Sequence, residues 1–135
     1  MLRRNQGGKI IIISSSKGLR GQARYAAYAA SKFALIGFAQ SLALELAPHR
    51  INVNVICPGM VDTERIGFIA AAMAPGGVSP EEYRLQMLRE RAAATPLGRV
   101  AEGADIAKVA AFLASSESDY LTGLSIPATG GCQLS

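Results

Sequence analysis

Three polar side chains in the first quarter of the chain have the types and spacing of an acid/base centre. Tyr28 follows Ser15 by thirteen residues, and Lys32 follows Tyr28 by four. Residues four apart on a helix share a face one turn apart. A free phenol ionises only at about pH 10, and a neighbouring ammonium favours its phenolate form. With a serine hydroxyl to polarise a carbonyl oxygen, such a pair suits ketone reduction or alcohol oxidation.

The Tyr-x-x-x-Lys spacing by itself also fits an ordinary helix. In that interpretation Tyr28 is a half-buried aromatic side chain and Lys32 is a solvated charge. His49 is the only histidine, and after Pro48 it is interpreted as a solvated loop residue, which disfavours a Ser-His-Asp or Cys-His centre. The choice between chemistry and packing depends on the elements that would position these side chains.

Ser15 and Tyr28 lie where a predicted strand passes into a long predicted helix. The β-branched run from Lys9 to Ser14 is typical of a strand buried on both faces. An Ala- and Leu-rich helix is predicted over Ala23–Ala47, because Pro48 cannot continue it. A second apolar strand is predicted over Ile51–Ile56.

The rest of the chain predicts further helices and one more strand. Ser79, Pro80 and Glu82 form a capping pattern for a helix that runs to Ala94. The other expected elements are a helical piece over Ile66–Ala74, a helix over Gly103–Ala114 and a strand over Leu124–Ala128. This order indicates an α/β fold in which three parallel strands are joined by crossover helices. Parallel sheets are normally extended at both edges, so we expect residues 1–135 to be a single partial domain.

Composition excludes several other classes of protein. The chain has 135 residues, half of them hydrophobic and 18% charged, which argues against disorder. Its net charge is +4, but the basic residues are scattered singly, so no nucleic-acid partner is expected. The longest run of large apolar residues, Ile10–Ile13, is too short to span a membrane. Cys57 and Cys132 lack metal-ligand spacing, so we expect no metal and a reducing, cytoplasmic location.

Four segments together resemble the short-chain dehydrogenase/reductase family. They are GGKIIIISSSKG, YAAYAASKFALIGFAQSLALELA, INVNVICPGMVDT and DYLTGLSIPATGG. The likeness covers essentially the whole chain but only the second half of the family's usual domain. It implies the C-terminal half of a Rossmann-like, doubly wound parallel sheet, with the N-terminal dinucleotide-binding half absent.

The resemblance also implies roles for individual residues. Tyr28 would be the general acid/base, Lys32 would stabilise its phenolate and bind the nicotinamide ribose, and Ser15 would orient the substrate oxygen. The segment that wraps the nicotinamide in this family matches four residues here: Pro58, Gly59, Val61 and Thr63. The cofactor would be NAD or NADP, and the positions that choose between them belong to the other half of the family's domain.

Two hypotheses follow from the resemblance. In the first, the chain belongs to an NAD(P)-dependent oxidoreductase that interconverts a small-molecule ketone and a secondary alcohol. In the second, it is a truncated, catalytically inactive fragment that acts only through subunit assembly. Without the Gly-rich phosphate seat, residues 1–135 alone are not expected to transfer hydride. The resemblance further implies a homo-oligomer through the Ala23–Ala47 helix, which carries a small-residue stripe with two larger neighbours: Ala34, Gly37, Ser41, Phe38 and Leu42.

Overall fold

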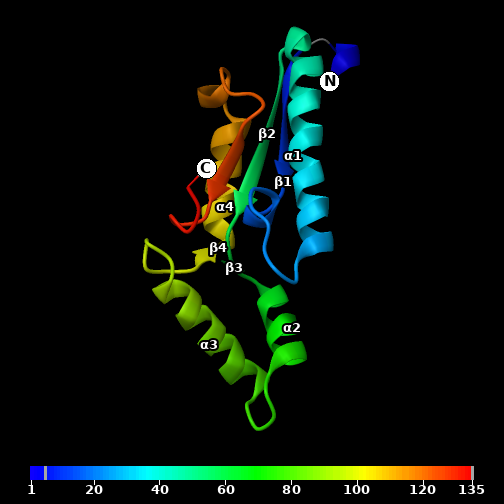
Figure 1. Ribbon diagram of the computed structural model, residues 1–135. Coiled ribbons are helices and arrows are strands. Elements are labelled where there is room, and N and C mark those ends of the chain that lie inside the picture. Colours follow the sequence, from blue (N-terminus) through cyan, green and yellow to red (C-terminus); the bar gives the residue numbers. More distant parts are fainter. Residues whose placement is uncertain (5, 135) are drawn as a thin grey trace.

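The main sheet is parallel and is built from three short segments that are far apart in the sequence. The computed structural model describes residues 1–4 and 6–134, and within them the strands are β1 (Gly8–Ile13), β2 (Ile51–Pro58) and β5 (Ser125–Ala128), in the order β1-β2-β5 (Figure 1). The β1–β2 register runs from Gly8 opposite Ile51 to Ile13 opposite Ile56. The predicted α/β fold with three parallel strands is confirmed.

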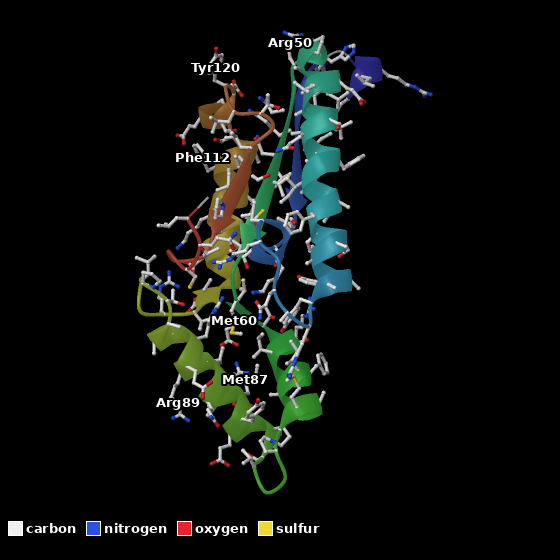
Figure 2. The ribbon with its side chains drawn as sticks, viewed as in Figure 1. Arg50, Met60, Met87, Arg89, Phe112 and Tyr120 are labelled. Carbon is white, nitrogen blue, oxygen red and sulfur yellow. The ribbon has the colours of Figure 1, made fainter. Side chains whose placement is uncertain are left out.

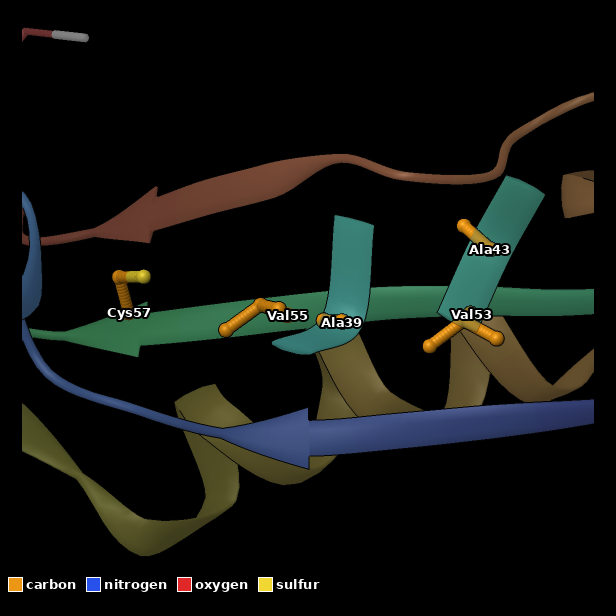
Figure 3. Close-up of a cluster of buried hydrophobic side chains, with 5 residues drawn as sticks. All are labelled: Ala39, Ala43, Val53, Val55 and Cys57. Atoms are coloured by element: carbon orange, nitrogen blue, oxygen red, sulfur yellow. The ribbon is translucent and has the colours of Figure 1, made fainter. Parts of the chain in front are cut away.

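The core lies where the first helix packs on the central strand. Helix α1 (Ala26–Leu46) covers one face of the sheet, and α4 (Gly103–Ala114) lies on the other (Figures 1 and 3). Successive β2 side chains point to opposite faces, so alternate residues meet α1. The buried cluster consists of Ala39 and Ala43 from α1 with Val53, Val55 and Cys57 from β2 (Figure 3). The two alanines allow the helix backbone to approach the strand closely.

Helix α1 begins three residues later than predicted. Arg24 has a φ of 69°, in the left-handed region, and a right-handed helix cannot pass through that conformation. At the other end the α-helix stops at Leu46, before Pro48, and one 3-10 turn (Ala47–His49) leads into β2. Both ends of α1 are therefore set by local backbone chemistry, and the start depends on a conformation that residue type did not reveal.

Helix α1 with the 3-10 turn after it also has the length and the mean hydropathy of a membrane-spanning segment. Ala26–His49 has a mean hydropathy of 1.2, with 17% of the tested window buried inside the fold. The run-length argument did not detect it, because the hydropathy comes from alanines and leucines dispersed along the helix. Length and composition are weak grounds for a membrane span, since the core helix of a soluble protein also meets both criteria.

Two helices project beyond the carboxyl ends of the strands. Helices α2 (Glu64–Met73) and α3 (Pro80–Ala93) form a hairpin at this end of the molecule (Figure 1). The predicted cap is present, because Ser79 Oγ accepts a hydrogen bond of 3.1 Å from the amide of Glu82. The start of α2 and the end of α3 lie near the carboxyl ends of the strands (Figure 1), which is where parallel folds place their sites.

A second small sheet connects this hairpin to the rest of the chain. Strands β3 (Val61–Asp62) and β4 (Ala101–Glu102) pair in parallel. Arg84 of α3 donates a hydrogen bond of 2.6 Å to Asp62, which connects α3 to β3. The sequence did not predict this pair, because two residues are too few to show periodicity.

Candidate active site

Ser15 lies at the carboxyl end of β1, at the start of a tight turn. Its Oγ accepts a hydrogen bond of 3.2 Å from the amide of Lys17, which caps the 3-10 turn Ser16–Gly18. The preceding Ser14 is buried, and its hydroxyl donates to the carbonyl of Lys32 over 2.8 Å. Ser14 therefore connects the strand to α1, and Ser15 is half-buried at the edge of the sheet.

Tyr28 and Lys32 occupy the first two turns of α1 and share one face, as their spacing predicts. The Lys32 ammonium lies 5.7 Å from the centroid of the Tyr28 ring. It also donates over 3.4 Å to the carbonyl of Ile13, the last residue of β1. A second cation, the Arg65 guanidinium from α2, lies 5.5 Å from the same ring centroid. Two cations from different helices therefore flank the Tyr28 ring.

A cavity of about 360 Å³ brings most of the predicted site residues together at the carboxyl ends of the strands. Of these residues, Ser15, Tyr28, Gly59, Val61 and Thr63 line it. The other two do not. Pro58 is buried within β2 opposite Ala128. Lys32 contacts the Tyr28 ring but does not itself line the cavity.

Gly59 lies in close packing at the rim of this cavity. Its amide donates to the carbonyl of Ala128 over 3.0 Å, and a Cβ added at Gly59 would lie 3.3 Å from the Cα of Thr129. That distance is tighter than ordinary van der Waals contact. The backbone after β2 therefore runs directly against the end of β5, which holds Val61 and Thr63 at the cavity.

Several lining residues were not predicted from the sequence. The basic ones are Lys17, Arg65 and Arg91, from the turn after β1, from α2 and from α3. Met60 also lines the cavity, whereas Phe68 and Met73 of α2 are 72% and 61% exposed. The sequence gave no sign that Lys17, Arg65 and Arg91 line one cavity with Tyr28, because these residues lie far apart along the chain.

The electrostatics of the cavity are one-sided. Among the described residues, its lining includes the three cations but no carboxylate. The pKa of Lys17 is below its ordinary value, first because the ammonium is partly buried and then because Arg91 and Arg20 are close. Burial also raises the pKa of the Cys57 thiol, which keeps it neutral. Among residues 1–4 and 6–134, no cluster of three or more His, Cys, Asp or Glu side chains could hold a metal ion.

Comparisons with known proteins find relatives over nearly the whole chain. A family model described as enoyl-(acyl carrier protein) reductase matches residues 1–133. The chain is 42% identical to galactitol 2-dehydrogenase from Agrobacterium fabrum over 132 residues, which are 97% of this chain and 50% of that protein. It is 39% identical to diacetyl reductase [(S)-acetoin forming] from Staphylococcus aureus, covering 94% of this chain and 48% of the relative.

Solved structures have the same fold over the same share of their length. A short chain dehydrogenase family protein from Francisella tularensis superimposes with a TM-score of 0.82 at 34% identity, over 92% of this chain and 50% of that one. Thermoplasma acidophilum aldohexose dehydrogenase gives 0.83 at 31% identity, over 92% and 47%. The chain belongs to the short-chain dehydrogenase/reductase family, with part of its Rossmann-type fold, as the sequence predicted. It spans about half the length of the curated relatives it matches.

Proposed function

We propose that the chain supplies the acid/base half of an oxidoreductase that transfers hydride between NAD or NADP and a carbonyl/alcohol pair. The observation that carries this proposal is the meeting of Ser15 and Tyr28 at one cavity, with Lys32 one helical turn behind the phenol. The relatives that share this half are named for dehydrogenase and reductase activities on small alcohols and ketones. We also propose a cytoplasmic location, with which the free thiols of Cys57 and Cys132 are consistent.

Each polar group has one task in the proposed reduction. The Tyr28 hydroxyl gives its proton to the carbonyl oxygen as carbon accepts hydride, and the alcohol forms. The Lys32 ammonium stabilises the phenolate that remains, and the Ser15 hydroxyl donates a hydrogen bond to the same substrate oxygen. In the oxidation direction the phenolate takes the proton back.

The residues beside Tyr28 fit the nicotinamide end of the cofactor, which supplies the hydride when bound. Val61, Ile66 and Ile69 give this cavity an apolar wall for a flat ring, and the Thr63 hydroxyl is available to a carboxamide. Gly59 keeps the backbone close enough to form that wall. No step depends on the part of a dinucleotide that would lie beyond these residues.

A chimera with a known relative tests this function. We expect the 132 matched residues of this chain, in place of the matched half of galactitol 2-dehydrogenase from Agrobacterium fabrum, to give a protein that oxidises or reduces an alcohol/ketone pair with NAD or NADP. The measurement is the absorbance of the reduced nicotinamide. A folded chimera that binds the dinucleotide but transfers no hydride to any of a panel of small ketones would contradict the proposal.

We propose in addition that the chain self-associates through α1. Phe33, Phe38 and Leu44 of this helix are 44%, 58% and 80% exposed. Ala34, Gly37 and Ser41 of the predicted stripe are also exposed, whereas Leu42 packs against the core and does not belong to this surface. An exposed apolar helix face with small residues along it suits a second copy of the same helix. Assembly without catalysis is the alternative function that this face favours.

Replacing Gly37 with leucine should weaken that association without harming the monomer. A Cβ at Gly37 meets nothing within 4 Å, and leucine is the better helix former. Because the added side chain would obstruct close helix approach, we expect the dimer Kd to rise about tenfold. Sedimentation equilibrium measures the change. Gly67→Leu is the matched control, since Gly67 is also a helical glycine with open space around it. A wild-type chain that stays monomeric at every concentration would contradict the proposal.

A further inference from the structure

A second cavity, of about 270 Å³, opens beside the active-site cavity. The two cavities share Ser16, Lys17, Gln22 and Arg91 in their linings, so they are adjacent. Arg20 and Thr129 line only the second cavity. We call the surface formed by Lys17, Arg20 and Arg91 the basic trough. It extends from the neighbourhood of Tyr28 toward the end of β5.

The basic trough holds three cations and, as far as the described residues show, no carboxylate. The cations come from the turn after β1, the following loop and α3, and within residues 1–4 and 6–134 no Asp or Glu lines either cavity. Lys9, Arg84 and Arg99 provide the basic partner of every ion pair found within residues 1–4 and 6–134, and all three lie outside the trough.

The Lys17 ammonium is destabilised by its burial and by the other cations of the basic trough. Its ammonium is partly buried, and it donates a hydrogen bond to the neutral side-chain oxygen of Gln22. The pKa of Lys17 lies below its ordinary value, because burial and then the charges of Arg91 and Arg20 disfavour the ammonium. Like charges held together around a cavity are relieved when an anion occupies it.

We propose that the basic trough binds a phosphoryl group, and that the substrate carries this group at the end remote from its carbonyl or alcohol. Two guanidinium groups and one ammonium match a dianionic phosphoryl better than a single carboxylate, because they offer more charge and more donors. The Ser16 side chain adds a hydroxyl to the same lining, whereas the Thr129 hydroxyl already donates to the carbonyl of Gln133 and accepts from its amide. The assignment to the substrate rests on the proposed function, since it requires the reacting carbon to lie at Tyr28.

Inorganic phosphate titrated into the isotope-labelled chain tests the site without any turnover. At constant ionic strength, with chloride as the reference anion, we expect saturable shifts of the backbone amides of Ser16, Lys17 and Cys132. Arg91→Gln should raise the phosphate Kd about tenfold or more, because one charge-assisted contact is lost. Phosphate should also raise the Tm of the wild-type chain and not that of the variant. Arg91→Gln removes repulsion from Lys17, so it is expected to fold at least as well.

Arg89→Gln is the matched control. Arg89 lies two residues before Arg91 on α3, and Figure 2 shows its side chain on the outer side of that helix. It lines neither of the two cavities, so its replacement should change the phosphate Kd by less than about twofold. Equal responses of the two variants, or phosphate shifts confined to other parts of the chain, would overturn the proposal.

A competition arm separates a phosphorylated substrate from the phosphates of the dinucleotide. This arm uses the galactitol 2-dehydrogenase chimera, which has the dinucleotide-binding half. Phosphate binding that persists when the chimera is saturated with NADH or NADPH supports the substrate assignment, and displacement by either one would overturn it. The chain with Tyr28→Phe should bind phosphate as the wild type does. A chimera without hydride transfer would therefore contradict the proposed function and leave the anion measurement intact, so the two failures are distinguishable.

Discussion

Replacing Tyr28 with phenylalanine should lower kcat of the galactitol 2-dehydrogenase chimera by about 10²- to 10⁴-fold, the range that a positioned acid/base contributes. In the proposed reduction the phenol supplies the proton that the carbonyl oxygen needs. Dinucleotide binding should remain within about twofold of the unmodified chimera, because the substitution removes only one oxygen. Stopped-flow absorbance of the nicotinamide and equilibrium fluorescence measure the two quantities separately.

The aromatic ring keeps its packing in this variant. Tyr28 meets the Tyr25 ring edge-on, with 6.3 Å between ring centroids, and phenylalanine preserves that contact. Within residues 1–4 and 6–134 the Tyr28 hydroxyl makes no hydrogen bond, so its removal leaves no buried partner unpaired. A loss of turnover would thus report chemistry and not unfolding.

Tyr25→Phe is the control for this experiment. Tyr25 lines the same cavity and is 45% exposed, but it lies before the first turn of α1 and away from Lys32. Its replacement should change kcat by less than about threefold. If Tyr25→Phe abolishes turnover and Tyr28→Phe does not, the assignment of the acid/base is wrong.

The second large effect is expected at Gly18, which lies between the serine turn and α1. A Cβ at this position would lie 2.6 Å from Ser14 Oγ and 2.8 Å from the carbonyl oxygen of Lys32. Those two atoms are joined by the hydrogen bond that fastens the end of β1 to α1. Gly18→Ala must therefore push the strand end and the helix apart.

We expect Gly18→Ala to lower the free energy of unfolding of the chimera by about 1–3 kcal/mol, the usual cost of overpacking a tight contact. Because Ser15 and Tyr28 stand on the two elements that separate, kcat should fall further, by up to about 10²-fold for a displacement of roughly 1 Å. Urea denaturation measures the first effect, and kcat under conditions where the protein stays folded measures the second.

Gly21→Ala provides the comparison in the same loop. A Cβ at Gly21 meets nothing within 4 Å. Its replacement should leave kcat unchanged and alter the free energy of unfolding by no more than about 1 kcal/mol, with the sign set by the unfolded chain. Equal stability of the two variants would show that the contact between Gly18 and Lys32 does not hold the site together.

Local patterns in the sequence were enough to predict the main elements and the family. Short-range signals predicted β1, β2 and α3: apolar runs for the two strands and the Ser79 cap for the helix. The observed bounds of each element agree with the predicted ones within a few residues. The spacing of Tyr28 and Lys32 is also local, because any helix brings residues four apart onto one face. The family likewise follows from motifs that stand in order along the chain.

Contacts between distant segments were not predictable in the same way. The β3–β4 pair joins segments forty residues apart through two residues each, which is too short for a periodic signal. Arg91 lies close to Lys17 only because α3 returns from the tip of the hairpin to the carboxyl ends of the strands (Figure 1). Leu42 packs against the core, although its spacing had placed it beside the small-residue stripe. Residue type and spacing describe a chain along its own length. Which cations face one cavity depends on how helices dock, and that is decided by packing over the whole fold.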